Sequence, residues 1–170
     1  MNNLRDAIRV VSDYPRAGID FYDITTLLKD PAHLGTVLTQ FCELIGHLEV
    51  HKVVGIEARG FLFAPTVAYH LGAGFVPVRK AGNLPAGTQR ESYALEYGFA
   101  EVEMHDDAVH FDGERFLIVD DVLATGGTAR AAARLVEKLG GRVVGYGFVL
   151  EIEALRGREP LDGVHSLMLV

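Results

Sequence analysis

Three absences limit the classes of protein to which this 170-residue sequence can belong. Its only cysteine is Cys42, so no internal disulfide can form, and no cysteine–histidine spacing predicts a zinc site. A single cysteine fits a reducing compartment best. No apolar run approaches the roughly 18 residues that span a membrane, and the segment MNNLRDAIRV lacks the apolar centre of a secretory signal. We therefore expect a cytoplasmic protein with no membrane association.

Positive charge is also in short supply. Lysine and arginine number 16 against 23 aspartate and glutamate residues, which gives a formal net charge of -7. Broad nucleic-acid binding needs a positive face, so no nucleic-acid partner is expected. A small anionic ligand is compatible with this charge, because a few local cations, backbone N–H groups or a metal ion bind phosphate even on an acidic protein.

What the sequence does contain indicates one globular α/β domain spanning residues 1–170. Strands are predicted at 52–57, 74–80, 115–121 and 142–150 with an edge strand at 165–170, and helices at 2–11, 31–48, 58–71 (after a turn) and 128–139. Asp30–Pro31 marks the start of the second helix. Residues 13–30 are expected to form an irregular lobe, and residues 81–106 a long loop or a hairpin. The alternation of continuous apolar strands with helices predicts a parallel sheet with helices on both faces.

Polar segments follow three of the predicted strands. They are Glu57–Arg59, Arg79–Lys80 and Asp120–Thr128. Ligands of parallel sheets bind at the carboxyl ends of the strands, so these segments are the candidates for a site.

The most informative segment is FLIVDDVLATGGT, residues 116–128. Gly126 and Gly127 let the backbone curl so that successive N–H groups point inward. The N-terminus of the following helix adds further free N–H groups and a partial positive charge. Thr125 and Thr128 supply hydroxyl donors. Together these features predict a phosphate-binding loop.

Two carboxylates before this loop indicate what else the ligand carries. A nucleoside-triphosphate loop needs a lysine followed by serine or threonine after its last glycine, whereas Thr128 is followed by Ala129. Asp120 and Asp121 repel phosphate but accept hydrogen bonds from sugar hydroxyls. A ribose 5-phosphate satisfies both halves of the motif. Two neighbouring buried carboxylates also need such partners, or a metal ion, to be tolerated.

The same stretch resembles the phosphoribosyl-pyrophosphate binding motif of the type I phosphoribosyltransferase family. Further stretches are similar to the adenine-specific branch of that family: YPRAGIDFYDITTLLKDP (14–31), ARGFLFAP (58–65), VRKAGNLP (78–85), ESYALEYG (91–98) and LRGREPL (155–161). The resemblance covers residues 13–168 approximately. It implies the type I phosphoribosyltransferase fold with a small N-terminal hood at about 1–30 and a flexible loop at about 81–106. It also implies transfer of a phosphoribosyl group to N9 of adenine, giving AMP and pyrophosphate.

The resemblance assigns roles to individual residues. Glu96 is expected to manage a purine-ring proton as a general acid or base. Arg59 is expected to stabilise the departing diphosphate, because its planar fork binds two oxygens at once. The remaining expected substrate-binding residues are Glu57, Ala58, Arg79, Lys80, Asp120, Asp121, Ala124, Thr125, Gly126, Gly127 and Thr128 for phosphoribosyl pyrophosphate, and Asp20, Phe21, Tyr22 and Tyr97 for the purine and the loop that covers it.

The resemblance further implies Mg²⁺ and a homodimer. The metal is expected to be held mainly by substrate oxygens and water rather than by protein ligands. Arg79 and Lys80 are expected to reach the pyrophosphate in part across the dimer interface.

Two positions depart from the family pattern. Asn83 stands where a phosphate-facing lysine is usual, and Tyr22 stands where the hood has arginine or lysine. Tyr22 leaves open a transferase for a 6-oxopurine such as hypoxanthine or guanine. A non-catalytic phosphoribosyl-pyrophosphate-binding regulator is a second alternative, although the sequence has no basic helix-turn-helix segment and retains Glu96.

Overall fold

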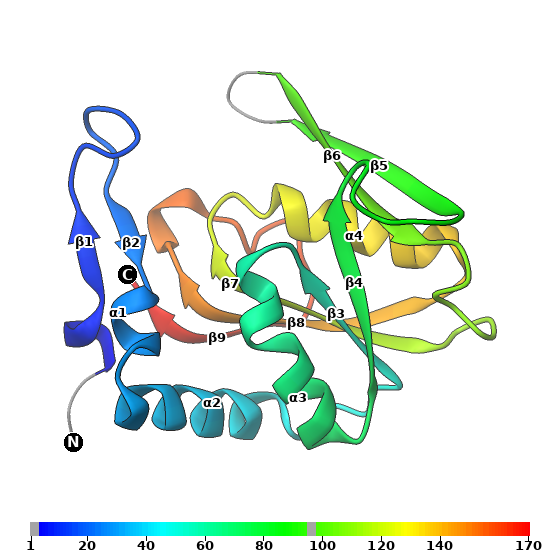
Figure 1. Cartoon of the computed structure of the whole chain (residues 1–170), viewed down its shortest axis with the longest axis horizontal. Coiled ribbons are helices and arrows are strands. Elements are labelled where there is room, and N and C mark those ends of the chain that lie inside the picture. Colours follow the sequence, from blue (N-terminus) through cyan, green and yellow to red (C-terminus); the bar gives the residue numbers. More distant parts are fainter. Residues whose placement is uncertain (1–3, 95–97) are drawn as a thin grey trace. The chain divides into compact units, whose positions relative to one another are not determined.

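The computed structural model of the chain describes residues 4–94 and 98–170 (Figure 1). The chain divides into two compact units, residues 1–40 and residues 41–170. The boundary falls inside helix α2 (Pro31–Ile45).

The first unit is built around a small antiparallel ribbon. A 3₁₀ turn at Leu4–Ala7 precedes strand β1 (Arg9–Val11), which pairs with β2 (Phe21–Asp23) so that Arg9 lies opposite Asp23. Helix α1 (Thr25–Leu28) follows, and α2 then begins.

The expected helix at residues 2–11 is therefore wrong after Ala7, and the lobe at 13–30 is more regular than expected. Nε of Arg9 donates to Oδ2 of Asp23 (3.1 Å), and the backbone N–H of Arg9 donates to Oγ1 of Thr26 (3.1 Å). Contacts with residues distant in the sequence outweigh the weak local preference for a helix. The start of α2 is confirmed, because Oδ1 of Asp30 accepts the backbone N–H of His33 (2.9 Å), as an N-cap does.

The second unit holds a mostly parallel sheet in the order β5-β6-β4-β3-β7-β8-β9. Its central strands β3, β4, β7 and β8 and the edge strand β9 are the five predicted from apolar runs, and β3–β4, β3–β7, β7–β8 and β8–β9 pair in parallel. The elements are β3 (Lys52–Ile56), a 3₁₀ turn η2 (Arg59–Leu62), α3 (Ala64–Leu71), β4 (Gly74–Lys80), β5 (Thr88–Ala94), β6 (Phe99–His105), β7 (Arg115–Leu123), α4 (Gly127–Lys138), β8 (Arg142–Glu151), a 3₁₀ turn η3 (Glu153–Leu155) and β9 (Val164–Leu169).

The segment at 81–106 contains a hairpin, one of the two alternatives that the sequence left open. Strands β5 and β6 pair antiparallel throughout, from Thr88 opposite His105 to Ala94 opposite Phe99. The hairpin also extends the sheet, since β6 pairs with the end of β4 at Arg79 and Lys80.

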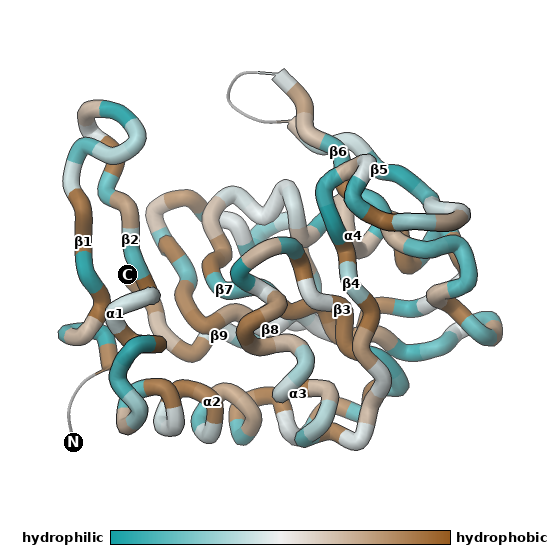
Figure 2. The backbone as a smooth tube through the Cα atoms, viewed as in Figure 1, coloured by the Kyte–Doolittle hydropathy of each residue, from teal (hydrophilic) through white to brown (hydrophobic). Residues whose placement is uncertain are grey.

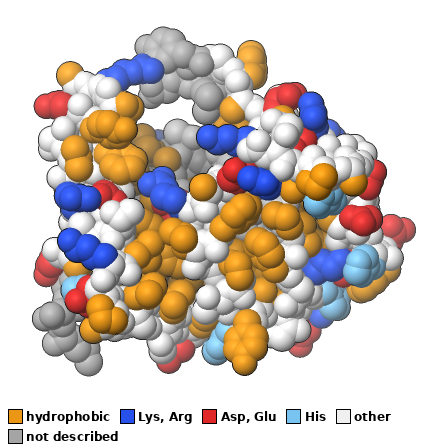
Figure 3. Space-filling model, viewed as in Figure 1, with side chains coloured by type: hydrophobic (Ala, Val, Ile, Leu, Met, Phe, Trp, Pro, Cys, Tyr) orange, Lys and Arg blue, Asp and Glu red, His pale blue; other side chains and the backbone are white. Residues whose placement is uncertain are grey.

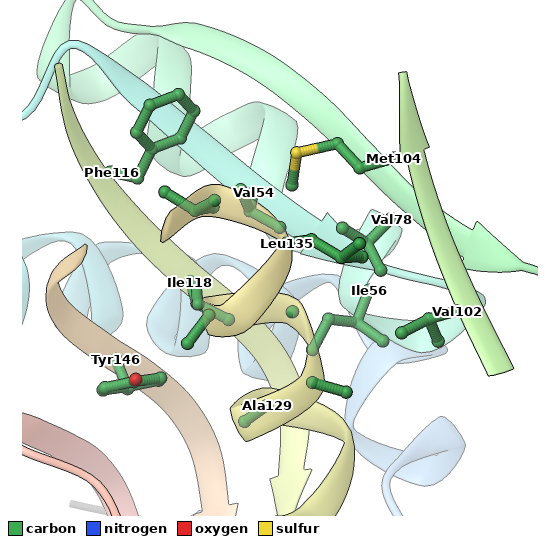
Figure 4. Close-up of a cluster of buried hydrophobic side chains, with 14 of the residues drawn as sticks. Val54, Ile56, Val78, Val102, Met104, Phe116, Ile118, Ala129, Leu135 and Tyr146 are labelled. Atoms are coloured by element: carbon green, nitrogen blue, oxygen red, sulfur yellow. The ribbon is translucent and has the colours of Figure 1, made fainter. Parts of the chain in front are cut away.

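Helices cover both faces of the sheet, as the sequence predicted. Val54 and Ile56 of β3 lie on one face, in a buried cluster with Leu135 of α4 (Figure 4). The intervening Gly55 lies on the other face, where an added Cβ atom would be 2.8 Å from Cβ of Ala64 in α3. Because neither face is open to water, the central strands are apolar along their middles (Figure 2).

The hairpin belongs to the same hydrophobic core. Val102 and Met104 of β6 are buried in the cluster that α4 covers (Figure 4).

Over the residues that the structure describes, no helix is both long enough and apolar enough to cross a bilayer.

Candidate functional site

The three polar segments predicted as site candidates lie together at the carboxyl ends of neighbouring strands. They follow β3, β4 and β7, which are neighbours in the order β4-β3-β7 and run parallel (Figure 1). The tertiary structure therefore brings residues 57–60, 79–83 and 120–128 together, although residues 61–119 separate the first segment from the last.

The loop Ala124–Thr128 surrounds a small hollow at the start of α4. Gly126 is the N-cap of the helix, has a φ of +79°, and offers no side chain to the free N–H groups of the first turn. The hollow measures about 70 Å³ and is lined by Asp120, Val122, Leu123, Ala124, Thr125, Gly126, Gly127, Thr128, Ala129 and Phe148. Whole-ligand pockets measure roughly 300–1,000 Å³, so this hollow suits one group of a larger ligand. Free N–H groups at a helix N-terminus favour an anionic group.

The structure distinguishes the two adjacent carboxylates. Asp120 lines the hollow and is partly exposed, whereas Asp121 is 3% exposed and does not line it. The alternation of side chains along a strand separates them. Oδ1 of Asp120 accepts the backbone N–H of Asp121 (2.9 Å).

Burial disfavours the charge on both carboxylates. Burial, and then the neighbouring Asp121, raise the pKa of Asp120 well above its ordinary value. Burial also raises the pKa of Asp121, while the charge of Arg59 acts in the opposite direction. Nε of Arg59 lies 2.8 Å from Oδ2 of Asp121. This contact is an ion pair without hydrogen-bond geometry, since Oδ2 has no hydrogen-bond partner within the described chain.

Gly60 allows the turn after β3 to approach the end of β7. A Cβ atom on Gly60 would lie 2.8 Å from the carbonyl oxygen of Val119 and 3.0 Å from Oδ1 of Asp120. Sequence reasoning assigned no role to Gly60 and missed this requirement. The signal was present, because a glycine in a strand-to-helix turn often marks close backbone approach.

Glu57 joins the segment after β3 to the segment after β4. Its carboxylate accepts Nε and Nη2 of Arg79 (3.2 and 3.1 Å) and the backbone N–H of Lys80 (2.9 Å). Nδ2 of Asn83 lies 3.2 Å from Oε2 of the same carboxylate, and the carbonyl oxygen of Asn83 accepts Nη1 of Arg79 (2.8 Å). These donors, with the Arg79 side chain making the largest contribution, lower the pKa of Glu57 to about 2. Asn83, noted in the sequence only as a departure, therefore belongs to this network.

The hairpin reaches the loop at the start of α4. A Cβ atom on Gly127 would lie 3.5 Å from Cδ2 of Tyr93 and 3.8 Å from the carbonyl oxygen of Ala94. The hairpin is fastened to α4, since Glu91 accepts Nε of Arg134 (2.5 Å) and also pairs with Lys138. Tyr93 is another residue that sequence reasoning missed.

Two predicted site residues, Glu96 and Tyr97, lie outside the described residues. Three others, Asp20, Phe21 and Tyr22, belong to the first unit. Asp20 is exposed, and Phe21 and Tyr22 lie on β2 with half-buried side chains. The Phe21 ring meets the Tyr14 ring edge-on at a centroid distance of 5.3 Å. That these three residues cover a purine stays a prediction.

The side chains that could bind a metal ion directly were compared for clustering. Across residues 4–94 and 98–170, no group of three or more histidine, cysteine, aspartate or glutamate side chains could hold one.

Comparison with known proteins identifies the family. Residues 28–164 match the family model described as phosphoribosyl transferase domain. The chain is 56% identical over 170 residues to an adenine phosphoribosyltransferase of Solibacter usitatus, covering 99% of this chain and 98% of the relative. It is 56% identical over 157 residues to that of Thermobifida fusca, covering 92% and 89%.

Solved structures agree with these relatives. An adenine phosphoribosyltransferase from Thermoanaerobacter pseudethanolicus superimposes with a TM-score of 0.93 at 45% identity, covering 98% of each chain. The enzyme from Saccharomyces cerevisiae, in complex with adenine and an imino-altritol bisphosphate, superimposes with a TM-score of 0.89 at 39% identity, covering 96% of each chain.

Proposed function

The chain belongs to the phosphoribosyl transferase family and acts as its adenine-specific relatives do, and we propose how its residues share that work. The reaction moves the phosphoribosyl group of 5-phosphoribosyl 1-pyrophosphate to adenine and yields AMP and pyrophosphate. Our assignment of roles depends mainly on one observation: Gly60 packs closely against the start of the Asp120–Thr128 segment, at the carboxyl ends of the parallel strands.

We assign the 5-phosphate of the substrate to the loop Ala124–Thr128. The hollow accommodates a single group, and the N–H groups at the start of α4 point to an anion. Asp120, which lines the same hollow, accepts hydrogen bonds from the ribose hydroxyls. Asp121 is too deeply buried for that role in this conformation, and we assign it to holding Arg59 by their ion pair.

The pyrophosphate is assigned to the turn after β3 and the end of β4. The backbone N–H group of Ala58, with the side chains of Arg59, Arg79 and Lys80, would stabilise the charge that develops as the bond from C1 of ribose to the diphosphate oxygen breaks. The new bond forms between C1 and N9 of adenine, and N9 loses its proton. Glu57 holds Arg79 and the turn at Asn83 in place rather than contacting the diphosphate, because its own oxygens are filled by donors.

Substrate oxygens and water would supply most of the ligands of a bound Mg²⁺. Bound in this way, it would neutralise negative charge on the leaving pyrophosphate. The chain's contribution is to align the substrate oxygens by way of Arg59 and the backbone of the turn.

Glu96 and Tyr97 are proposed to act on the purine. Glu96 lies two residues along the chain from Ala94, whose carbonyl oxygen approaches Gly127. A carboxyl group suits proton transfer at the purine ring. Asp20, Phe21 and Tyr22 are proposed as the hood residues, with Phe21 stacking on the base and the main chain at Asp20 reading its edge.

We propose that two chains associate through the face formed by η2, α3 and β4. Leu62, Tyr69 and Phe75 are 51%, 89% and 39% exposed on these elements. Hydrophobic side chains gather over this region (Figure 3), and such patches commonly mark interfaces. Leu62 and Arg59 share the turn η2, so a partner bound here would come close to the pyrophosphate residues.

A cytoplasmic location is proposed from the cysteine content, with Cys42 free and buried.

Incubation of the purified chain with phosphoribosyl pyrophosphate, Mg²⁺ and adenine tests the function. AMP and pyrophosphate should appear in equal amounts, and omission of adenine should abolish AMP formation. Pyrophosphate release without AMP would contradict the proposed transfer.

A further inference from the structure

One stretch that resembles the family, LRGREPL at residues 155–161, has no role in the site described above. In the folded chain its backbone lies against the loop Ala124–Thr128. A Cβ atom on Gly126 would lie 2.4 Å from the carbonyl oxygen of Gly157. A Cβ atom on Gly157 would lie 2.1 Å from the carbonyl oxygen of Ala124. The two backbones therefore touch with no side chain between them.

The two glycines are required for different reasons. Gly126 has a φ of +79°, so another residue there would be strained whatever space it had. Gly157 is not among the glycines with positive φ, so alanine can adopt its backbone conformation. A methyl group at position 157 would lie nearest to the Ala124 carbonyl, at 2.1 Å from its oxygen and 2.9 Å from its carbon, and then to Cδ1 of Leu123, at 3.0 Å. This position thus separates the effect of crowding from the effect of backbone conformation.

The chain on either side of Gly157 is anchored to the sheet. Glu151, at the end of β8 and 2% exposed, accepts Nε and Nη2 of Arg158 at 2.6 Å each, together with Oγ of Ser166 in β9 (2.6 Å). The backbone N–H of Ile152 donates to the carbonyl oxygen of Leu123 (2.9 Å). A bidentate arginine–carboxylate pair restricts orientation as well as distance. Gly157 consequently cannot retreat freely if a side chain is added.

We propose that Gly157 is a positioning residue for the phosphate loop, and that the Arg158–Glu151 pair holds it there. The inference rests on the proposed role of Ala124–Thr128 in binding the 5-phosphate. The absence of a side chain at position 157 sets how far the Ala124 carbonyl lies from the hollow. A carbon and an oxygen approach no closer than about 3.3 Å in ordinary contacts. A methyl group at position 157 would therefore displace Ala124 by about 1 Å, a shift that can cost up to about 100-fold in a positioned site.

The test compares Gly157→Ala with Gly141→Ala. A Cβ atom on Gly141, at the turn between α4 and β8, would also be crowded, but less closely and by side chains: it would lie 2.7 Å from Cγ1 of Val136 and 2.9 Å from Cε2 of Phe116. Both variants should lower the melting temperature. Only Gly157→Ala should raise the KM for phosphoribosyl pyrophosphate, by about 10- to 100-fold, with the KM for adenine within about two-fold of the parent. Calorimetry with phosphoribosyl pyrophosphate alone should show the same loss of affinity.

Arg158→Lys provides a second measurement if Gly157→Ala does not fold. Lysine keeps the charge but lacks the planar fork, so the anchor loosens while Gly157 stays. We expect a rise of about three- to ten-fold in the KM for phosphoribosyl pyrophosphate, again without a change for adenine. Equal losses in Gly157→Ala and Gly141→Ala, or parental affinity in both Gly157→Ala and Arg158→Lys, would overturn the proposal. Failure of the parent chain to bind phosphoribosyl pyrophosphate would instead overturn the proposed function.

Discussion

Arg79 donates from both Nε and Nη2 to the carboxylate of Glu57, at 3.2 and 3.1 Å. This pair links the turn after β3 to the end of β4, two strands that are adjacent in the sheet. The same carboxylate also receives the backbone N–H of Lys80 and the amide of Asn83. A single acid therefore organises both segments to which we assign the pyrophosphate.

Replacement of Glu57 by glutamine should weaken pyrophosphate binding by removing the charge that orients Arg79. We expect the KM for phosphoribosyl pyrophosphate to rise about ten-fold, which corresponds to roughly 1.4 kcal/mol. The KM for adenine should not change. Glu49→Gln is the matched control, since Glu49 is exposed and lies 3.6 Å from Arg115 in a surface ion pair. Similar kinetics for Glu57→Gln and the parent would contradict the organising role.

The same variant has a defined dependence of stability on pH. The folded pKa of Glu57 is about 2, below the ordinary value of 4.5. Its stabilising contribution is therefore fully present above pH 4.5 and is lost as the pH falls towards 2. The difference in unfolding free energy between parent and Glu57→Gln, about 1–3 kcal/mol at pH 7, should shrink over that interval. Urea unfolding at several pH values measures it, and a constant difference would exclude the assigned cause.

Conversion of both Asp120 and Asp121 to asparagine should abolish most turnover without unfolding the chain. Asparagine accepts weaker hydrogen bonds from ribose hydroxyls and leaves Arg59 without its ion pair, so we expect kcat/KM to fall at least about 100-fold. The melting temperature should be maintained or raised at pH 8, because burial opposes both charges. Steady-state kinetics measure kcat/KM, and thermal melts measure stability. Near-parental kinetics would contradict the roles assigned to Asp120 and Asp121.

Replacement of Glu96 by glutamine should lower kcat while leaving the KM for phosphoribosyl pyrophosphate nearly unchanged. A positioned general acid or base contributes roughly 10²- to 10⁴-fold, so a loss of about 100-fold is expected. Glu101→Gln serves as the control on the same hairpin, because Glu101 is exposed and its carboxylate accepts Oγ of Ser92 (3.0 Å). A kcat within two-fold of the parent would assign the proton transfer elsewhere.

Adenine should remain the preferred base despite Tyr22. Adenine presents an N6 donor and an N1 acceptor, whereas hypoxanthine and guanine reverse both. The main chain at Asp20 supplies N–H and C=O groups whatever side chain stands at position 22. A polar edge left unpaired is rejected by roughly 10⁴-fold, so we expect adenine to exceed both 6-oxopurines by at least about 100-fold in kcat/KM. Rates with each purine measure this, and comparable rates on hypoxanthine would show that the departure changed the substrate.

The proposed apolar interface predicts a dimer. Sedimentation at micromolar concentration should give about twice the chain mass of 18.5 kDa. Leu62→Asp should shift the species towards monomer and reduce activity, since the interface adjoins Arg59. Leu169→Asp, at another exposed apolar position on β9, should leave the assembly unchanged. Full activity in a monomeric parent chain would refute a shared interface near the site.

Several features of the fold and the site were accessible from the sequence because they are local. Apolar runs such as Phe116–Val119 are continuous only in strands buried on both faces, so the parallel sheet could be predicted. The carboxyl ends of such strands meet, which indicated that Arg59, Arg79 and Asp120 would lie near one another. Gly126 and Gly127 after an apolar strand indicated an anion-binding loop through their backbone freedom alone.

Other features depend on contacts between residues far apart in the sequence, and only the tertiary structure could decide them. Residues 9–11 form a strand rather than a helix because Arg9 meets Asp23. Asp120 and Asp121 look equivalent in the sequence, yet strand alternation exposes one to the hollow and buries the other beside Arg59. The order of the strands brings Arg79 within hydrogen-bonding distance of Glu57. The packing of two loops brings Gly157 against the carbonyl group of Ala124. Composition and spacing determine which residue types are present at a strand end, but the packing of the strands determines which of them touch.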